Sequence, residues 1–475
     1  MSAISNARWI LISQGARTLL QLTSLTVLSR LLPPSEYGLM AMATVVINFA
    51  NLLRDMGTAA AVVQKQELTD QTTSTVFWLN IGLGLALALG LLALSPLIAS
   101  LFHAPRLMPV LWVLALVFPI TSSGAVHQAL FERASGFRLL ARIEVVAAGS
   151  GLALAIVLAW LGWGVYSLAL QALATAVIAT GQLWLASRWR PLRLWDRAEF
   201  RQLLGFSGHL TGFTFINYFA RNADAMIIGR VLGSMPLGIY SQAYKVMMFP
   251  LQSMTYVASR ALFPIMSRQQ HDKPQMARLY FRSVGVIATL TAPLMAGVWL
   301  LRAPFIDIML GPRWAEVGTV LAWLAPVGFI QSLTSTIGTV FMATGRTDIL
   351  MKQGLISTVL LVSSFLIGVR WGINGVAACY CAANVLNLLP CFYYTLKELN
   401  CGVGDLLAAV WKPVLFALLM TALLYPLVEM LRSQQSAVLV ELLLPSLVGM
   451  LIFGALILAF SRSLLQDLKK LMGAR

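Results

Sequence analysis

The chain has 475 residues, of which 59% are hydrophobic and 11% charged, and its mean hydropathy is +0.79. Soluble globular proteins carry about 25% charged residues, so this composition excludes a soluble domain and indicates a polytopic membrane protein. In a soluble protein the net charge of +16 would favour a nucleic-acid partner, so its meaning here depends on where the charges lie.

Windows of about 20 mostly apolar residues predict fourteen membrane spans joined by short connections. The predicted spans are 8–32, 37–63, 73–101, 107–131, 141–161, 164–188, 205–232, 236–267, 276–301, 316–343, 347–370, 373–396, 406–431 and 437–461. The tightest connections are Leu161–Gly164 and Arg370–Ile373. We expect Phe249-Pro250 and Thr291-Ala-Pro293 to be kinks within helices rather than helix ends.

The basic residues predict the orientation of these spans. If the N-terminus lies in the cytoplasm, 21 of the 34 Lys and Arg residues fall on cytoplasmic loops and ends, 7 on outer loops, and 6 inside spans. Fourteen spans then place both termini in the cytoplasm. This asymmetry accounts for most of the net charge, so we expect no nucleic-acid partner.

An internal repeat divides the chain. At an offset of 200 residues, Leu28–Leu32 falls on Ile228–Leu232 and Gly38 falls on Gly238; near an offset of 211, Gly164-Val165 falls on Gly375-Val376. Spans 1–6 therefore resemble spans 7–12, and such repeats place a substrate site between the halves near the midplane. We expect an N-terminal lobe at 1–190, a basic cytoplasmic linker at 191–204, a second lobe at 205–396, and two further spans with a basic tail at 397–475.

Polar stripes mark the first two spans of each half. In the segment TFINYFARNAD, Thr214, Asn217, Arg221 and Asp224 recur at three- and four-residue steps, which places them on one helix face. Buried ionisable groups at membrane depth are costly unless they face protein or water, so the stripes predict a shared hydrated cavity. The candidate substrate-binding residues are Arg17, Gln21, Asn48, Asn217, Tyr218, Arg221, Lys245, Gln252 and Arg260, and the candidate coupling-ion residues are Asp55 and Asp224.

The cationic balance of these stripes favours a substrate with a phosphate or acidic group and many hydroxyls, because guanidinium groups match phosphate oxygens two at a time. Plainer interpretations stand beside this one. Arg17 is also consistent with a structural ion pair, Arg221 with a helical pair to Asp224, and Arg260 with a charge that sets topology.

No enzymatic or metal constellation accompanies the stripes. The sequence has no GxxxxGK loop, HExxH motif or Ser-centred elbow. Its four cysteines and four histidines lack ligand or disulfide-framework spacing. We therefore expect no cofactor, no metal and no enzymatic activity.

Two motifs carry a family resemblance: LLPPSEYG at Leu31–Gly38, and RDMG at Arg54–Gly57 in the stretch that runs on to Gln64. The chain resembles bacterial polysaccharide flippases of the Wzx type, in the multidrug/oligosaccharidyl-lipid/polysaccharide exporter superfamily, and the WzxC-like branch most of all. The resemblance implies an all-α, two-lobed, V-shaped fold around a central cavity.

The same resemblance implies movement of undecaprenyl-diphosphate-linked oligosaccharide across the bacterial inner membrane by alternating access. It implies Na⁺ or H⁺ as coupling ion, and the polymerase and glycosyltransferases of one pathway as partners. Two alternatives stay open: a cation-coupled multidrug exporter of the same fold, and a membrane polysaccharide polymerase or ligase. The short outer loops weigh against the enzyme, and the positive cavity weighs against an exporter of cationic drugs.

Overall fold

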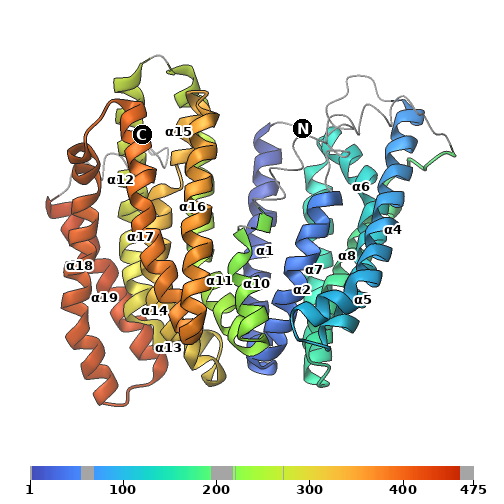
Figure 1. Cartoon of the computed structure of the whole chain (residues 1–475), viewed down its shortest axis with the longest axis horizontal. Coiled ribbons are helices and arrows are strands. Elements are labelled where there is room, and N and C mark those ends of the chain that lie inside the picture. Colours follow the sequence, from blue (N-terminus) through green and yellow to red (C-terminus); the bar gives the residue numbers. More distant parts are fainter. Residues whose placement is uncertain (1–2, 55–68, 194–217, 220, 271, 461–475) are drawn as a thin grey trace. The chain divides into compact units, whose positions relative to one another are not determined.

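The computed structural model describes residues 3–54, 69–193, 218–219, 221–270 and 272–460 (Figure 1). The side chains of residues 3–8, 10–12 and 250–261 are also outside this description. The described residues form α-helices, two 3₁₀ turns and connections, with no strand among them, so the predicted all-α class is confirmed. They divide into two compact units, Met1–Gly238 and Ile239–Arg475.

In the first unit the described residues form nine helical segments, of which the last is the start of α11. These are α1 (Ala3–Leu31), α2 (Pro34–Arg54), α4 (Asp70–Leu101), α5 (Leu107–Ala115), α6 (Val117–Arg133), α7 (Phe137–Trp160), α8 (Val165–Ala186), α10 (Ala223–Val231) and α11 (Ser234–Arg268), which continues into the second unit. Helices α7 and α8 pack along each other, α1 packs on α7, and α6 lies against α4 and α8.

The second unit contains the remaining described helices. These are α12 (Lys273–Leu300), α13 (Arg302–Met309), η1 (Pro312–Trp314), α14 (Ala315–Thr334), α15 (Ile337–Ala343), α16 (Thr347–Gly368), η2 (Val369–Trp371), α17 (Gly372–Leu399), α18 (Val403–Ser433) and α19 (Val438–Phe460). Helix α12 lies at its centre, in contact with α14, α17, α18 and α19. The units are defined by compactness and not by the repeat, so the predicted lobe boundaries stay predictions.

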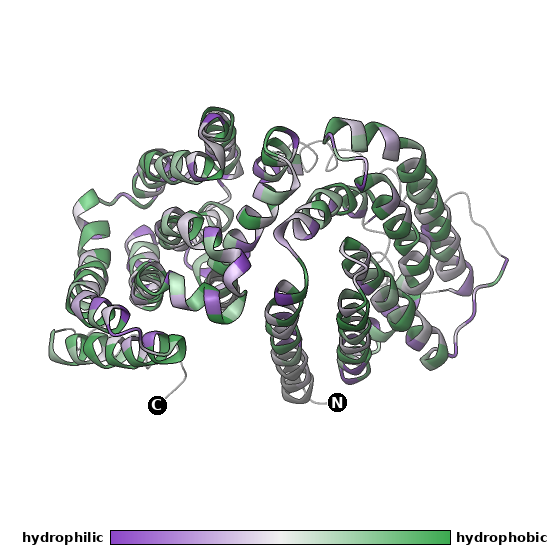
Figure 2. Cartoon of the chain, turned by 90° about the horizontal axis from the view of Figure 1, so that it is seen from below, coloured by the Kyte–Doolittle hydropathy of each residue, from purple (hydrophilic) through white to green (hydrophobic). Residues whose placement is uncertain are grey.

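Ten helical stretches in the described residues are long and apolar enough to cross a membrane, and one of them, Thr347–Leu399, joins α16 and α17. The chain is therefore a multi-pass membrane protein, while the count of fourteen spans stays a prediction. Hydrophobic residues run along most helices of each unit (Figure 2). On α18 and α19 many of them are exposed, including Leu418, Leu423, Met450 and Leu451, as expected for helices that face lipid.

The two tight connections predicted from sequence are present, and glycines build both. Helix α8 follows Gly162 (φ 82°) and Gly164 (φ 56°), and α17 begins at Gly372 (φ 72°), all in a region that side chains with a Cβ rarely adopt. The counterpart of Gly164 is therefore Gly372. The predicted match to Gly375 is wrong, because Gly375 lies inside α17, where its backbone packs against Gly368 of α16.

Two predicted single spans are each two helices. The span 107–131 is interrupted at Leu116, between α5 and α6. Pro119 explains the break, because it has no N–H to bond the carbonyl of Ala115 and its ring crowds that carbonyl. The span 316–343 is interrupted after α14, where the Ser335 hydroxyl donates to the Ser332 carbonyl at 2.7 Å and competes with the helical pattern. In contrast, α11 and α12 run on through Pro250 and Pro293, so these prolines do not end helices.

The start of the predicted cytoplasmic linker is tied to α4. The Leu192 amide donates to the Ser74 hydroxyl at 3.1 Å, and the Trp78 indole donates to the Leu192 carbonyl at 2.8 Å. Residues 194–217, which include the rest of the linker, lie outside the described residues.

Candidate functional site

The polar face of α1 is partly used by an ion pair. The Arg17 guanidinium lies 3.2 Å from a carboxylate oxygen of Glu144 on α7, and the buried Ser13 hydroxyl donates to the same oxygen at 3.2 Å. The Arg17 and Glu144 side chains remain 55% and 44% exposed, and Gln21, one turn further along α1, is exposed as well. Arg17 therefore forms the structural ion pair that was the alternative to a cavity role, and about half of its side chain stays exposed.

Sequence reasoning missed Glu144. It lies seven residues after Phe137, about 10 Å along α7. The available signal was an acidic residue inside the predicted span 141–161, which is costly unless paired. Periodicity within one helix does not report a partner on another helix.

The start of the 218–224 segment contacts α2. The Tyr218 hydroxyl donates to the Val45 carbonyl, and its ring centroid lies 5.6 Å from that of Phe49. Asn48 lies between these two α2 positions and is exposed. The structure thus brings Tyr218 and Asn48 to the same stretch of α2, with the Tyr218 hydroxyl already bonded.

The predicted continuous helix across Arg221 and Asp224 is interrupted at Asn222. Helix α10 begins at Ala223, and the backbone of Asn222 (φ −112°, ψ 10°) departs from helical values. Its side-chain amide donates to the Tyr218 carbonyl at 2.9 Å, and its backbone N–H donates to the same carbonyl at 3.1 Å. Arg221 is exposed before the break. Asp224 lies in the first turn of α10 and accepts the Ala225 N–H at 2.7 Å, a position that favours an anionic side chain.

The remaining candidates divide between described and undescribed residues. Lys245 is exposed on α11, five residues after Tyr240 and next to Tyr244. The rings of these two tyrosines stack with their centroids 6.3 Å apart. The side chains of Gln252 and Arg260 on α11, and residues Asp55 and Asn217, lie outside the described residues. Lys245 belongs to the second unit and the other described candidates to the first.

The Glu36-Tyr37-Gly38 motif joins several helices of the first unit through the Glu36 carboxylate. Glu36 is buried at the start of α2 and pairs with Arg106, just before α5, at 3.0 Å. Its second oxygen accepts the Val165 N–H at the start of α8 at 2.6 Å. One carboxylate thus holds three elements, and a Cβ at Gly164 would lie 2.8 Å from it.

Gly38 and Gly238, which the predicted repeat pairs, face each other in the same unit. A Cβ on Gly38 would lie 1.6 Å from the Ser234 carbonyl oxygen, and a Cβ on Gly238 would lie 1.9 Å from the Pro34 carbonyl oxygen. Ser234 is the repeat counterpart of Pro34 at an offset of 200, so the contact is reciprocal. The beginnings of α2 and α11 therefore meet backbone to backbone, which only glycine permits.

The Arg230 side chain caps the C-terminal end of α4. Its guanidinium donates to the Ser100 carbonyl at 3.2 Å and to the Leu101 carbonyl. These carbonyls lie at the C-terminal end of a helix, where a cationic side chain is favourable.

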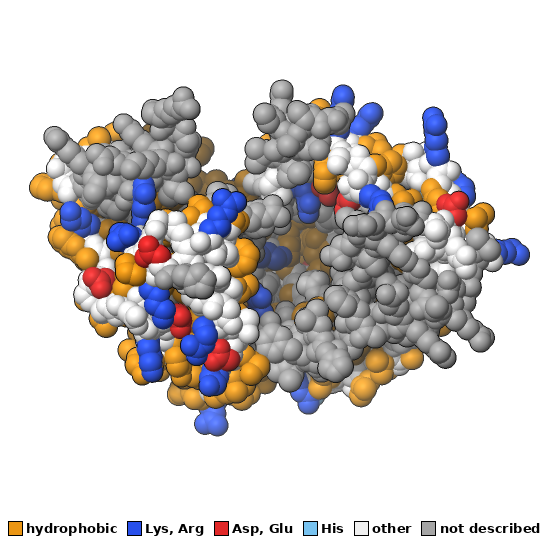
Figure 3. Space-filling view, turned by 90° about the horizontal axis from the view of Figure 1, so that it is seen from above, with side chains coloured by type: hydrophobic (Ala, Val, Ile, Leu, Met, Phe, Trp, Pro, Cys, Tyr) orange, Lys and Arg blue, Asp and Glu red, His pale blue; other side chains and the backbone are white. Residues whose placement is uncertain are grey.

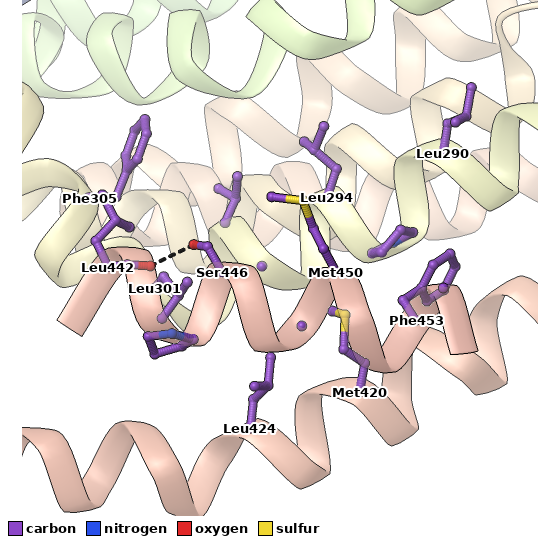
Figure 4. Close-up of a pocket in the computed structure, with 16 residues that line it drawn as sticks. Leu290, Leu294, Leu301, Phe305, Met420, Leu424, Leu442, Ser446, Met450 and Phe453 are labelled. Atoms are coloured by element: carbon purple, nitrogen blue, oxygen red, sulfur yellow. Dashed lines mark hydrogen bonds between the residues drawn. The ribbon is translucent and has the colours of Figure 1, made fainter. Parts of the chain in front are cut away.

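An apolar cavity of about 470 Å³ lies among α12, α13, α18 and α19 of the second unit (Figure 4). Leu294, Phe305, Met420 and Met450 are among its lining residues, and the hydroxyl of the lining Ser446 donates to the Leu442 carbonyl at 2.6 Å. No lining residue is charged. The cavity suits a hydrocarbon chain and offers nothing to a sugar or a phosphate.

Lys and Arg side chains gather on the face in Figure 3. In the second unit, Arg346 binds Asp348 through two contacts, at 3.0 and 3.1 Å, and both Arg346 and Lys273 lie 3.5 Å from Glu398. The hydrogen bonds and charge of Asp348 raise the pKa of the Arg346 guanidinium above its ordinary value. These pairs tie the starts of α12 and α16 to the end of α17.

Comparisons with known proteins give a consistent result. A family model described as polysaccharide biosynthesis protein matches residues 27–319, more than half of the chain. The lipopolysaccharide biosynthesis protein WzxC of Escherichia coli (strain K12) is 27% identical over 91% of this chain and 88% of its own length. The succinoglycan biosynthesis transport protein ExoT of Rhizobium meliloti (strain 1021) is 27% identical over 99% of this chain and 95% of its own.

Among solved structures, the lipid II flippase MurJ in an inward closed conformation matches with a TM-score of 0.72. The match covers 98% of this chain and all of that chain, at 15% identity. At this identity the likeness establishes the fold alone.

Proposed function

Because this chain belongs to the polysaccharide biosynthesis protein family, we propose that it is a flippase that carries lipid-linked oligosaccharides across the membrane. The observation that carries the proposal is similarity along nearly the whole chain to a protein named for succinoglycan transport. The fold shared with a lipid II flippase supports it, since lipid II is also a lipid-linked saccharide. The proposed activity is transport, without enzymatic turnover of the cargo.

The polar candidates support a charged, hydroxylated cargo. Arg17, Arg221 and Lys245 are exposed cations on segments predicted to span the membrane, and guanidinium groups bind phosphate oxygens in pairs. We assign the diphosphate to these three residues. The oligosaccharide is assigned to the remaining candidates from the sequence: Gln21, Asn48, Asn217, Tyr218, Gln252 and Arg260.

The apolar cavity supports a polyprenyl carrier. Its wall of aliphatic, Met and Phe side chains is uncharged, and burying each CH₂ of a hydrocarbon contributes about 0.8 kcal/mol. A cargo of this kind has both an apolar and a phosphorylated part, and the chain offers surfaces for each.

We further propose the bacterial inner membrane as its location, with cytoplasmic termini, on the strength of the 21 to 7 distribution of basic residues. The polymerase and glycosyltransferases of one pathway are the proposed partners. Na⁺ or H⁺ is the proposed coupling ion, with Asp55 and Asp224 as the acidic candidates from sequence.

Deletion of the gene tests the proposal. We expect lipid-linked oligosaccharide to accumulate on the cytoplasmic leaflet and surface polysaccharide to be lost, with both restored by the wild-type gene. Normal surface polymer in a deletion strain without a second flippase would refute the proposal. Accumulation of a cationic drug in place of the lipid-linked saccharide would indicate the multidrug exporter.

A further inference from the structure

A second apolar cavity, of about 310 Å³, lies among α12, α14 and α18 of the second unit. Ala292, Ala296 and Trp299 line it from α12 at steps of four and three residues, which places them on one helix face. The larger cavity, assigned above to the polyprenyl chain, takes Leu294 and Gly297 from the other side of the same helix. The smaller cavity is therefore a separate site, and the proposed function makes no use of it.

One face of α18 changes from apolar to cationic toward the C-terminal end of the helix. Val414, Leu418 and Thr421 line the smaller cavity. Tyr425 and Arg432 continue this face, because they follow Thr421 by four and eleven residues. Leu418 and Tyr425 are 63% and 54% exposed, so the face is open to the surroundings of the helix. An apolar surface, an aromatic ring and a cation follow one another, as they do beside a lipid tail, the membrane interface and a headgroup.

A second cation accompanies Arg432 at this end. Arg302 begins α13, donates to the Trp299 carbonyl at 2.6 Å, and lies 5.2 Å from the centre of the Trp299 ring. Burial and the charge of Arg432 hold the pKa of the Arg302 guanidinium below its ordinary value, so the two cations are close enough to repel each other. Arg432 has Glu429 at 3.7 Å, whereas Arg302 has no carboxylate partner in the part of the chain that the structure describes. A bound anion would relieve this repulsion.

The distance from the arginines to the cavity matches the depth of one leaflet. Thr421 and Arg432 are eleven residues apart, which is about 16 Å along α18. The hydrocarbon layer of one leaflet is about 15 Å thick, half of the bilayer core. The predicted spans 276–301 and 406–431 both run outward if the N-terminus is cytoplasmic, so the arginines lie at the outer end. A lipid of the outer leaflet with its phosphate at the arginines therefore reaches the cavity with its tail.

The charges and the volume select the class of lipid. Two guanidinium groups match the oxygens of one phosphate in pairs, and two arginines with Glu429 leave one net positive charge. An anionic headgroup neutralises that charge, whereas a zwitterionic headgroup brings its own cation and does not. The smaller volume, about 310 Å³ against about 470 Å³, suits an unbranched acyl chain better than a methyl-branched polyprenyl chain.

We propose that this face of α12 and α18 binds one anionic phospholipid of the outer leaflet, with its phosphate between Arg302 and Arg432 and one acyl chain in the smaller cavity. The rings of Trp299 and Tyr425 lie beside the interfacial part of the lipid. The phosphate neutralises the two cations and the chain fills the cavity, so the lipid stabilises the packing of α12 on α18.

Native mass spectrometry of the purified full chain in detergent tests the site, with phosphatidylglycerol as the anionic probe and phosphatidylcholine as the zwitterionic probe. We expect the wild type to bind phosphatidylglycerol at least about tenfold more tightly than phosphatidylcholine. Arg432→Gln should weaken phosphatidylglycerol binding at least about tenfold, while Arg313→Gln, which removes an exposed arginine of η1, should leave it unchanged. Ala296→Leu in the smaller cavity should weaken binding, whereas Gly297→Leu in the larger cavity should not.

Four results would overturn the proposal. Equal binding of the two lipids, or unchanged phosphatidylglycerol binding in the double variant Arg302→Gln, Arg432→Gln, would remove the phosphate site. Unchanged binding in Ala296→Leu would remove the acyl chain from the smaller cavity. Displacement of phosphatidylglycerol by an equal amount of undecaprenyl phosphate would assign the site to the carrier lipid. Each measurement is made without an oligosaccharide cargo, so its failure leaves the proposed function standing.

Discussion

The glycine contact between α2 and α11 gives the sharpest stability prediction. In Gly38→Ala the new methyl group would lie 1.6 Å from the Ser234 carbonyl oxygen, and real Cβ contacts essentially never fall under 3.0 Å. The two helix starts must separate by about 1.4 Å. The obstacle is backbone, so rotation of a side chain cannot relieve it. In Gly238→Ala the new methyl group would lie 1.9 Å from the Pro34 carbonyl oxygen, so the helix starts must separate by about 1.1 Å.

The expected cost follows from the two competing effects of the substitution. Overpacking costs about 1–3 kcal/mol, while replacing a helical glycine by alanine gains about 0.5–1 kcal/mol. We therefore expect each variant to be destabilised, Gly38→Ala more than Gly238→Ala. Both methyl groups lie in one contact, so separating the helices once relieves both. The loss of stability in the double variant should therefore be smaller than the sum of the two single losses, by at least about 0.5 kcal/mol.

Thermal unfolding of the purified protein in detergent measures these effects. Gly82→Ala on α4 is the matched control, because a Cβ there meets nothing within 4 Å. It should unfold at or slightly above the wild-type temperature. The close contact would be absent, and the reasoning refuted, by either of two results. One is that Gly38→Ala unfolds at the same temperature as Gly82→Ala and the wild type. The other is that the losses of stability of the two single variants add in the double variant.

Further predictions concern the carboxylate cluster, the cavity and the cationic candidates. Arg106→Ala should destabilise the protein by about 1–3 kcal/mol, because it leaves the buried Glu36 carboxylate without its cation, and Glu36→Gln should be milder; equal losses in thermal unfolding would contradict this. Gly297→Leu and Gly454→Leu place a side chain where a Cβ meets nothing within 4 Å, inside the apolar cavity, and should lower export at unchanged protein level. Gly90→Leu on α4 has the same open space outside the cavity and should export normally; equal export by all three would remove the cavity from the cargo path. Arg221→Ala should reduce export at least tenfold, the ratio expected for loss of about 1.4 kcal/mol of diphosphate binding, and wild-type export by this variant would exclude it as a contact.

Local features of the chain were predictable from sequence because local chemistry produces them. Hydropathy located the apolar helices, and short glycine-containing connections located the turns before α8 and α17. The sequence comparison aligned Gly164 with Gly375 only because both positions hold glycine followed by valine. The backbone conformation, with φ 72° at Gly372, corrects the alignment, because the property that matters there is left-handed backbone and not small size.

Long-range pairings were not predictable from periodicity. Glu36 and Arg106 are 70 residues apart, and Arg17 and Glu144 are 127 apart. A helical stripe reports which residues share a face and is silent about the partner helix. The interruption at Asn222 escaped for a related reason. The backbone of Asn222 departs from helical values (φ −112°, ψ 10°) without any change in the hydrophobic pattern of the segment.

The proposed activity of this chain is the movement of a lipid-linked oligosaccharide from one leaflet to the other. The most direct measurement reconstitutes the purified chain in vesicles that contain a lipid-linked oligosaccharide with a fluorescent glycan. A membrane-impermeant reductant then bleaches the glycans exposed on the outer leaflet. If the account is right, bleaching proceeds beyond the outer-leaflet fraction in vesicles with the wild-type chain and slows in Arg221→Ala vesicles. Bleaching that stops at the outer-leaflet fraction, as in protein-free vesicles, would contradict it.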